Sequence, residues 1–445
     1  MGGSAFSSHS NPLFTPRIPT EVYRRALSRC HAALREIFLY VATPIEGPAK
    51  KDHGDLDILV AVDRRSIFPV PGSETTERTD AELMEAVTNA LHAEYSIIHG
   101  PQAHFAIRWP SDLEHDKRGD TIMTDAQDAV PGIGGTEEKV KYIQVDVRIC
   151  PNFDQLSWSL YKHAHGDIWN ILGSTIRPFG LTIDEEALWI RIPEIEKLDR
   201  KQSKVMLSKD PVEILHFLGL KVEGFWTEPF DSIEALFGYA ASCRLFWVRR
   251  PEEGLDCDGD AVGVTVGDAG RKKLKSNDRR RMTYRPVFRQ WIDEYIPSLQ
   301  ALCHSNPEGP QRTVSEQREE VRNQAFAAFR VEAVYNQQLR RWRTERGVLA
   351  IKRLIKTTQP DLDPQFRGSL HSALRKILLE GNDELGIISP NALRDSDGVL
   401  DVDIARDFVE RNWKAIGELA LRHNNQKYHE QKSLEAPKRL PDNLN

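Results

Sequence analysis

Residues 54–62 read GDLDILVAV, in which two acids stand at the entrance to a nearly continuous apolar run. Such a run is typical of a strand covered on both faces, so it predicts a strand inside a sheet. Side chains two positions apart on a strand point to the same side, so Asp55 and Asp57 are expected to project together while Leu56 and Ile58 face the opposite layer. Taken alone, such a pair is compatible with a solvated strand end. It is also the kind of site that attracts Mg²⁺, which prefers oxygen ligands.

A third acid favours the cation site. The segment YIQVDVRI, residues 142–149, alternates in polarity and predicts another strand, in which Asp146 lies between Val145 and Val147. A charge in this apolar setting is costly unless it has a partner.

The turn before the acid pair is rich in glycine and cations. These residues are Gly47, Lys50, Lys51, His53 and Gly54. Turns of this composition expose backbone N–H groups that bind phosphate. The sequence therefore places a candidate phosphate site beside a candidate cation site.

The pattern of the first 158 residues mixes helices and strands. Periodicity predicts helices over 20–36 and 77–95, and strands over 37–42 and 104–109. Residues 110–138 are polar and rich in Gly, Asp and Pro, which predicts a long loop. The order of elements indicates an α+β fold with a mixed β-sheet flanked by helices, followed by mainly helical parts.

The rest of the chain is expected to be mostly helical. Residues 160–172 predict one helix and residues 181–192 a hairpin. The sequences DPVE at 210–213 and DSIE at 231–234 each carry the acid spacing of a helix start. Helices are expected again from 315 to about 421, with breaks near Gly347, Pro360 and Pro390.

These patterns predict five segments of the chain. They are a flexible N-terminal tail (1–19), an α+β domain (20–158), a mainly helical second domain with the hairpin and a basic segment (159–306), a C-terminal helical region (314–424) and a flexible C-terminal tail (425–445).

Composition excludes several classes of protein. No window of about 18 apolar residues is present, so no membrane-spanning segment is expected. The 5 cysteines include no CxxC pair, which argues against a disulfide scaffold and a zinc module. An intracellular protein, cytoplasmic or nuclear, is the simplest interpretation. The formal net charge of −6 argues against nucleic-acid binding by the whole surface but leaves room for a local basic patch. The sequence does not indicate the oligomeric state.

The order of these motifs resembles the nucleotidyltransferase superfamily typified by DNA polymerase β. The resemblance rests on the triplet in GDLDILV together with Asp146, and it covers about residues 20–155. It implies that Asp55, Asp57 and Asp146 are catalytic and bind two divalent cations, Mg²⁺ or Mn²⁺. The implied reaction moves a nucleoside monophosphate from an NTP, such as ATP, to a hydroxyl acceptor and releases pyrophosphate. Asp146 would serve the ion that activates the acceptor hydroxyl.

The turn departs from the family's pattern. Where members carry Gly-Ser after the strand that precedes the triplet, this chain has Ala42-Thr43, followed by Pro44. Thr43 keeps a hydroxyl for a phosphate oxygen, and Gly47 is expected to supply the close backbone approach. The residues assigned to nucleotide binding are Thr43, Gly47, Lys50, Lys51, His53 and Gly54.

A basic segment near residues 271–289 stands out in this acidic chain. Its candidate nucleic-acid-binding residues are Lys272, Lys273, Lys275, Arg279, Arg280, Arg281 and Arg285. Tyr284 and Trp291 lie close enough in sequence to offer stacking faces for bases. A solvated loop or a nuclear import signal is the alternative interpretation.

Three functions remain open from the sequence. The first is nucleotidyl transfer to an RNA 3′ end, which the basic segment favours. The second is the same chemistry on a small molecule, a protein side chain or a second nucleotide, giving a signalling oligonucleotide, which the net negative charge favours. The third is a non-catalytic nucleotide-binding scaffold, which the missing Gly-Ser favours and the complete acid triad opposes.

Overall fold

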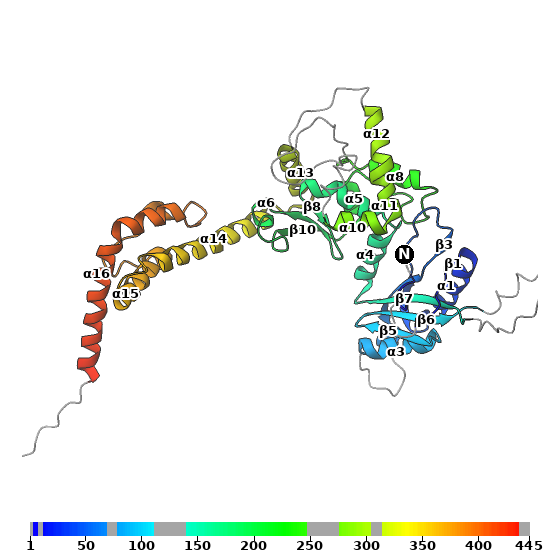
Figure 1. The fold of residues 1–445 in the computed structure, drawn as a ribbon, viewed down its shortest axis with the longest axis horizontal. Coiled ribbons are helices and arrows are strands. Elements are labelled where there is room, and N and C mark those ends of the chain that lie inside the picture. Colours follow the sequence, from blue (N-terminus) through cyan, green and yellow to red (C-terminus); the bar gives the residue numbers. More distant parts are fainter. Residues whose placement is uncertain are drawn as a thin grey trace, which may run out of the picture. The chain divides into compact units, whose positions relative to one another are not determined.

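The structure is a computed structural model, and it describes residues 3–7, 12–68, 78–110, 139–246, 276–303 and 314–435. The chain is α+β, with a mixed five-stranded sheet and many helices (Figure 1). It divides into two units. Unit 1 comprises Met1–Arg191 and Met206–Arg330, and unit 2 comprises Ile192–Val205 and Val331–Asn445.

Unit 1 is built on the five-stranded sheet. Its strands, in spatial order, are β2 (Phe38–Ala42), β4 (Leu56–Asp63), β7 (Tyr142–Cys150), β6 (Gln102–Arg108) and β5 (Tyr95–His99). The pair β4 and β7 is parallel, and the other neighbours are antiparallel. The apolar run of β4 therefore lies in the interior of the sheet, as its sequence predicts.

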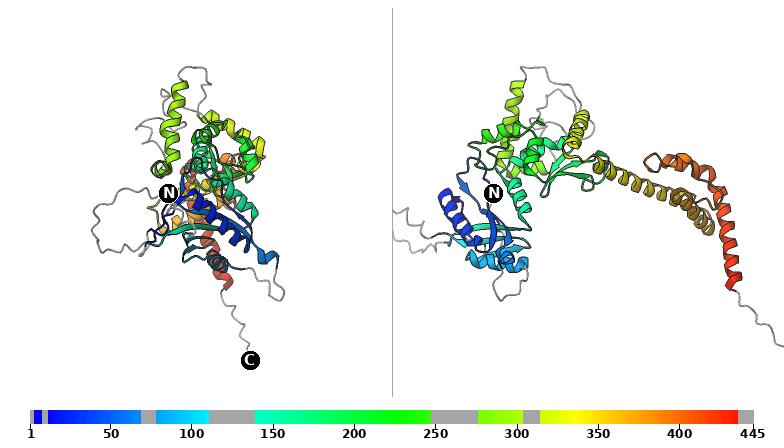
Figure 2. Two further views of the ribbon diagram at one scale, coloured as in Figure 1. Left: turned by 90° about the vertical axis from the view of Figure 1, so that its right-hand side faces the viewer. Right: turned by 180° about the vertical axis from the view of Figure 1, so that it is seen from behind.

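One face of the sheet carries the main core of unit 1. Leu56, Ile58 and Val60 of β4 pack there beside Val145 and Val147 of β7. Two helices cover this face, namely α1 (Thr20–Arg35) and α3 (Asp80–Ala90), and both turn a stripe of buried apolar side chains toward it. In the right-hand view of Figure 2, the strands lie between α1, drawn in dark blue, and α4.

The opposite face is apolar near the end of β4 and polar near its start. Leu59 and Ala61 pack with Leu156 of α4 (Phe153–His163), which covers that end. Asp57 precedes them on the same face because side chains alternate along a strand. The acid pair thus lies where α4 leaves the sheet uncovered.

Unit 1 contains further strands and helices. Two short strands, β1 (Ile18–Pro19) and β3 (Asp52–His53), pair with each other, and β8 (Leu181–Ile183) and β9 (Leu188–Arg191) form the predicted hairpin. The strand β10 (Lys204–Ser208), of which Met206–Ser208 belong to unit 1, is the third strand of that sheet. The helices are α2 (Arg64–Ile67), α5 (Ile168–Ile176), η3 (Arg177–Phe179), α7 (Pro211–Phe217), α8 (Ile233–Ala241), α10 (Ser276–Tyr284), α11 (Pro286–Gln290), η4 (Trp291–Tyr295), α12 (Ile296–Cys303) and α13 (Val314–Phe329).

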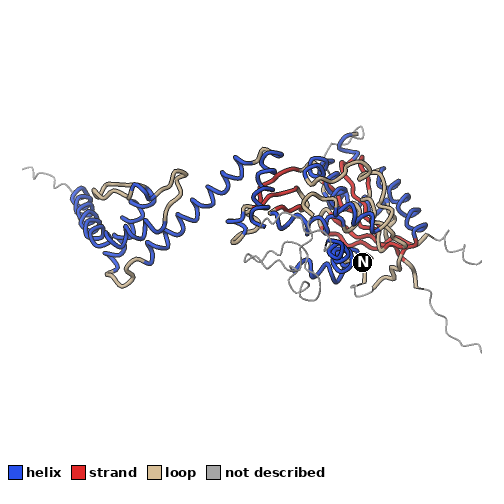
Figure 3. The backbone as a smooth tube through the Cα atoms, turned by 90° about the horizontal axis from the view of Figure 1, so that it is seen from above, coloured by secondary structure: helices blue, strands red, loops and turns tan. Residues whose placement is uncertain are grey.

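Unit 2 has a helical core of its own. Its helices are α6 (Pro193–Glu196), α14 (Glu332–Thr357), α15 (Pro364–Arg375), η5 (Lys376–Glu380), η6 (Asn391–Leu393) and α16 (Val402–Glu435), and from α14 to α16 it contains helices and loops (Figure 3). Buried Ile351, Leu374 and Ile416 bring α14, α15 and α16 together. In the described part of the chain, no helix is long and apolar enough to cross a membrane.

Several predicted boundaries were wrong. The helix expected over 160–172 is two helices, because His165 and Gly166 adopt positive φ angles between α4 and α5. The helix expected over 77–95 ends at Ala90, and the end of that range opens the missed strand β5. The break expected near Gly347 does not occur, since α14 runs through it. The break lies instead at Arg330, whose φ is 55°.

The expected domain limits also need correction. Residues of the supposed N-terminal tail are packed, because Phe6 and Ile18 are buried and β1 pairs with β3. The helix α16 extends to Glu435, so residues 425–435 are not a tail, and the last ten residues lie outside the described part. The sheet and the following helices form one unit rather than two domains, and α13 belongs to it.

Candidate active site

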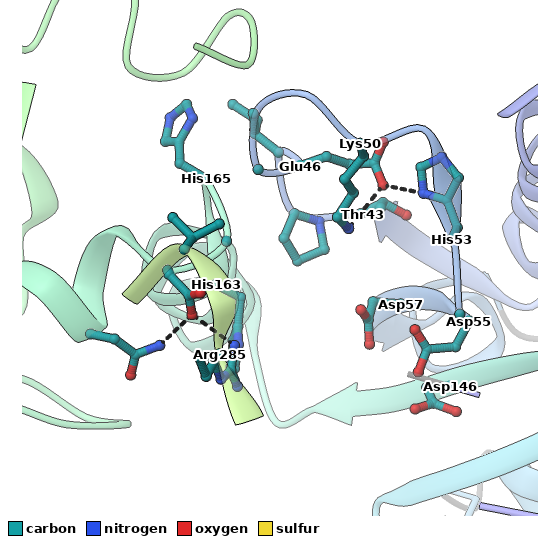
Figure 4. A pocket seen from close by; sticks show the side chains of 18 of the residues that line it. Thr43, Glu46, Lys50, His53, Asp55, Asp57, Asp146, His163, His165 and Arg285 are labelled. Carbon is teal, nitrogen blue, oxygen red and sulfur yellow. Dashed lines mark hydrogen bonds and ion pairs between the residues drawn. The ribbon is translucent and has the colours of Figure 1, made fainter. Parts of the chain in front are cut away.

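Three carboxylates share one face of the sheet near the start of β4. Asp55 directly precedes β4, Asp57 is its second residue, and Asp146 is paired in register with Asp57 on the parallel strand β7. Paired residues point to the same face, and neighbouring strands lie about 4.8 Å apart. The three side chains consequently lie together (Figure 4), on the face opposite Leu56 and Ile58.

The grouping disfavours the ionised form of Asp57. Burial raises the pKa of Asp57 to about 6, and the charges of Asp55 and Asp146 add to the increase. The cations Lys50 and His163 act in the opposite direction and do not outweigh it. A cation placed among the three carboxylates would remove this penalty.

The donor set fits a divalent cation by its chemistry. Carboxylate oxygens are ligands that Mg²⁺ and Mn²⁺ prefer. Within the described residues, however, no group of three or more His, Cys, Asp or Glu side chains is already arranged to hold a metal ion. Two of the carboxylates are engaged with the protein instead: Asp55 Oδ2 accepts from the Gly3 amide at 3.0 Å, and Asp146 Oδ1 is also bonded. One oxygen of each of these two carboxylates, Asp55 Oδ1 and Asp146 Oδ2, has none of these hydrogen bonds.

Two side chains fix the orientation of Asp146. His104 Nδ1 lies 2.7 Å and Gln144 Nε2 2.8 Å from Asp146 Oδ1. His104 lies on β6, directly opposite Asp146 of β7, and Gln144 lies two residues before Asp146 on β7. All three side chains therefore share one face of the sheet. Burial raises the pKa of Asp146, and these two hydrogen bonds oppose the increase. Both donors use Oδ1, so neither engages Oδ2.

Thr43 is tied to α1. It follows the last residue of β2, and its Oγ1 lies 2.9 Å from His31 Nε2. Burial lowers the pKa of His31, with a smaller contribution from Arg35, so this imidazole is neutral near pH 7. The hydroxyl that the sequence assigned to phosphate binding is thus available at the cleft but is already hydrogen-bonded to a histidine that the sequence did not single out.

The turn between Thr43 and β3 docks on the turn between α4 and α5. The His165 amide donates to the Ile45 carbonyl at 2.7 Å. A Cβ on Gly166 would lie 3.3 Å from Gly47 Cα, and the φ of Gly166 is +67°, so both the close contact and the backbone conformation favour glycine at position 166. A Cβ on Gly47 would lie 3.5 Å from Gly166 Cα, which is an ordinary contact, so this docking does not require glycine at position 47.

A carboxylate of the same turn balances the turn's cations. Glu46 Oε1 lies 3.4 Å from Lys50 Nζ and 2.8 Å from His53 Nδ1 (Figure 4). The buried His53 ring stacks on Tyr23 with ring centroids 3.7 Å apart. Burial lowers the pKa of His53, and Glu46 only partly offsets this effect. The turn is therefore less cationic than its sequence suggests.

A cleft of about 1660 Å³ in unit 1 contains the carboxylates. The predicted nucleotide-binding residues that line it are Thr43, Gly47, Lys50, His53 and Gly54. Lys51 does not line it and is exposed, with its carbonyl accepting from Thr20 Oγ1 at 3.3 Å. The structure thus brings five of these six residues to the three aspartates.

Another part of the cleft wall is one side of α10. Asn277, Arg280, Arg281 and Tyr284 line the cleft, and their spacing of three and four residues places them on one helix face. Arg280 is exposed and, among the described residues, its side chain forms no hydrogen bond or ion pair. Arg279 is exposed too but does not line the cleft. The predicted Lys272, Lys273 and Lys275 lie outside the described residues.

Two acids hold two other arginines of the basic segment, Arg281 and Arg285. Buried Asp278 Oδ1 lies 2.6 Å from Arg281 Nη1, and Asp278 also pairs with Arg177 of η3. Burial acts to raise the pKa of Asp278, but its two arginine partners outweigh burial and lower it. Arg285 Nη1 lies 3.0 Å from Asp167 Oδ1, across the pocket from the aspartates (Figure 4). These pairs anchor α10, so part of the basic segment is structural.

Sequence reasoning missed four contributors to the site: His31, Glu46, His104 and Gln144. Each depends on a contact across the fold or within the turn. The alternation of HFAIR in β6 places His104 on the face opposite Phe105, but only the register between β6 and β7 sets it beside Asp146.

Neither a protein-family model nor a curated protein matches this sequence. The residues and geometry of the cleft are therefore the basis for inferring function.

The raised pKa of Asp57 makes stability depend on pH. Between the ordinary value of 3.8 and about 6, the folded protein keeps this proton while the unfolded chain has lost it. The protonated Asp57 side chain therefore contributes fully to the stability of the folded protein below pH 3.8. This contribution is lost as the pH rises through about 6. In metal-free buffer, we expect Asp57→Asn to gain stability relative to the wild type as the pH rises from 4 to 7. Denaturant unfolding at each pH measures this difference, and a difference independent of pH would contradict it.

Proposed function

We propose that the chain is a metal-dependent nucleotidyltransferase that transfers a nucleoside monophosphate from an NTP to a hydroxyl acceptor. The observation that carries the proposal is the grouping of Asp55, Asp57 and Asp146 on one sheet face inside a cleft. The order of elements around them also resembles the nucleotidyltransferase fold typified by DNA polymerase β, and we propose that unit 1 contains this fold.

The charges around the cleft support an NTP as substrate. Asp55, Asp57 and Asp146 would hold Mg²⁺ or Mn²⁺, which would neutralise phosphate charge and polarise the reacting oxygens when bound. The arginine side chain of Arg280 is presented to the same cleft. An anion that enters the cleft thus meets a cationic side chain of α10 as well as the metal-binding face.

The chain's own residues supply positioning. His104 and Gln144 fix Asp146 through Oδ1, so its carboxylate is pre-oriented for the acceptor side. Thr43 offers its hydroxyl at the cleft, and the docking of the turn on Gly166 fixes where that hydroxyl lies. Phosphoryl transfer depends on such alignment and on charge neutralisation more than on covalent chemistry.

The acceptor is proposed to be an RNA 3′ end, with a small hydroxyl compound or nucleotide as the second candidate. A specific observation favours the second. Arg281 and Arg285 are paired with Asp278 and Asp167, so the described part of the basic segment does not form a continuous cationic surface. Incubation with each labelled NTP, Mg²⁺ or Mn²⁺, and either RNA or total small metabolites decides between them by where the label appears. No label transfer and no pyrophosphate under any condition would contradict the enzyme and favour a nucleotide-binding scaffold.

The change Asp146→Asn should reduce nucleotidyl transfer at least about a hundredfold, because an amide binds the cation poorly and cannot take a proton from the acceptor. Binding of a fluorescent NTP in Mg²⁺ should remain, since Asp55 and Asp57 still face the cleft. Pyrophosphate release measures transfer. Asp154→Asn, at an exposed position on α4, is the matched control and should behave like the wild type. Unchanged transfer in Asp146→Asn would show that this acid is only structural.

Two adjacent arginines of α10 provide a second test. Arg280→Ala should weaken substrate binding about tenfold, the effect expected when one charged hydrogen bond is lost. Arg279→Ala removes the same charge from a position that does not line the cleft and should leave binding unchanged. Comparing the KM for the NTP with the affinity for RNA, over a range of salt concentrations, shows which substrate Arg280 contacts. Equal effects of the two changes would mean that only net charge matters.

A further inference from the structure

The N-terminal strap, residues 3–7, lies on the carboxylate face of unit 1. The Gly3 amide donates a hydrogen bond of 3.0 Å to Asp55 Oδ2. The Gly3 carbonyl accepts one of 2.8 Å from Thr15 Oγ1, which holds the peptide in place from its other side. Ser4, the next residue, lines the cleft. A backbone donor thus occupies one of the two carboxylate oxygens of Asp55.

The space around Gly3 is too small for a side chain. A Cβ at this position would lie 2.3 Å from the Gly54 carbonyl oxygen, and the φ of Gly3 is +82°, which L residues rarely adopt. The contact is therefore specific to glycine at position 3 and is easily removed by the addition of one methyl group.

Two further contacts join the strap to the sheet. The Ala5 amide donates to Gln144 Oε1 at 3.0 Å, and Gln144 Nε2 in turn donates to Asp146. The side chain of Phe6 is 2% exposed and packs with Ala106 and Tyr142. An aromatic anchor and a hydrogen-bond chain thus link the strap to two of the three carboxylates.

We propose that the strap is an autoinhibitory element that competes with the metal ion for Asp55. This inference rests on the proposed function, because it assigns Asp55 to metal binding. With the strap in place, the amide of Gly3 supplies the partial positive charge that the crowded carboxylates lack, and Asp55 is held to the strap. A metal ion that takes Oδ2 breaks this hydrogen bond. Linkage then requires metal binding to weaken the attachment of the strap by the same factor by which the strap weakens metal binding.

The change Gly3→Ala tests the competition in the whole 445-residue chain. Calorimetric titration of the metal-free protein with Mn²⁺ should show about tenfold tighter binding in Gly3→Ala than in the wild type, because a hydrogen bond to a charged group no longer has to be broken. Reciprocally, saturating Mn²⁺ should increase amide hydrogen exchange in the N-terminal peptide of the wild type.

A second pair of variants controls for general effects. Phe6→Ala removes the buried anchor and should also tighten Mn²⁺ binding, whereas Phe14→Ala, at a side chain that is 45% exposed, should not. Equal Mn²⁺ affinity in the wild type and Gly3→Ala would contradict the inhibitory role of the strap but would leave the proposed function intact. Weaker binding in Gly3→Ala would also overturn it, since the strap would then be orienting Asp55 for the metal. If neither the wild type nor any variant bound Mn²⁺, both the inhibitory role of the strap and the proposed function would be contradicted.

Discussion

Repulsion among Asp55, Asp57 and Asp146 is the constraint on which the rest of the site depends. The parallel register of β4 and β7 fixes two of these carboxylates side by side, and alternation along the strand adds the third. Burial on the same face prevents water from screening them fully, so the proton of Asp57 is held to a pH of about 6. The protein partly compensates with donors from the Gly3 amide and from side chains around Asp146. A divalent cation would compensate more completely, which is the physical basis of the proposed chemistry.

The arginines of α10 respond to a second electrostatic constraint. Asp278 is a buried residue of α10 itself and needs cations, which Arg281 and Arg177 provide. Arg285 similarly pairs with the nearly buried Asp167. These pairs set the orientation of α10 and leave Arg280 as a cationic side chain presented to the cleft. Cations that looked like one binding surface in the sequence therefore have two different roles.

The sequence predicted those features that depend on local pattern. The strand β4, the face shared by Asp55 and Asp57 and the helix α1 follow from periodicity, which short-range sterics enforce. Contacts set by register or by docking could not be predicted. The neighbourhood of Asp146 and His104 depends on which strands pair, and the packing of the N-terminal strap depends on a cavity that distant strands create. The turn was misjudged for a related reason, since Glu46 and Tyr23 neutralise or bury its cations.

The central claim is that the three aspartates form one cation site. Diffraction from crystals of the protein soaked in Mn²⁺ and a non-hydrolysable NTP, collected at a wavelength where manganese scatters anomalously, tests it most directly. We expect an anomalous peak within about 2.2 Å of carboxylate oxygens of Asp55 and Asp57, and a second ion at Asp146 when both metal positions are occupied. Ordered NTP with no anomalous peak at these aspartates, or a peak held by other residues, would contradict it.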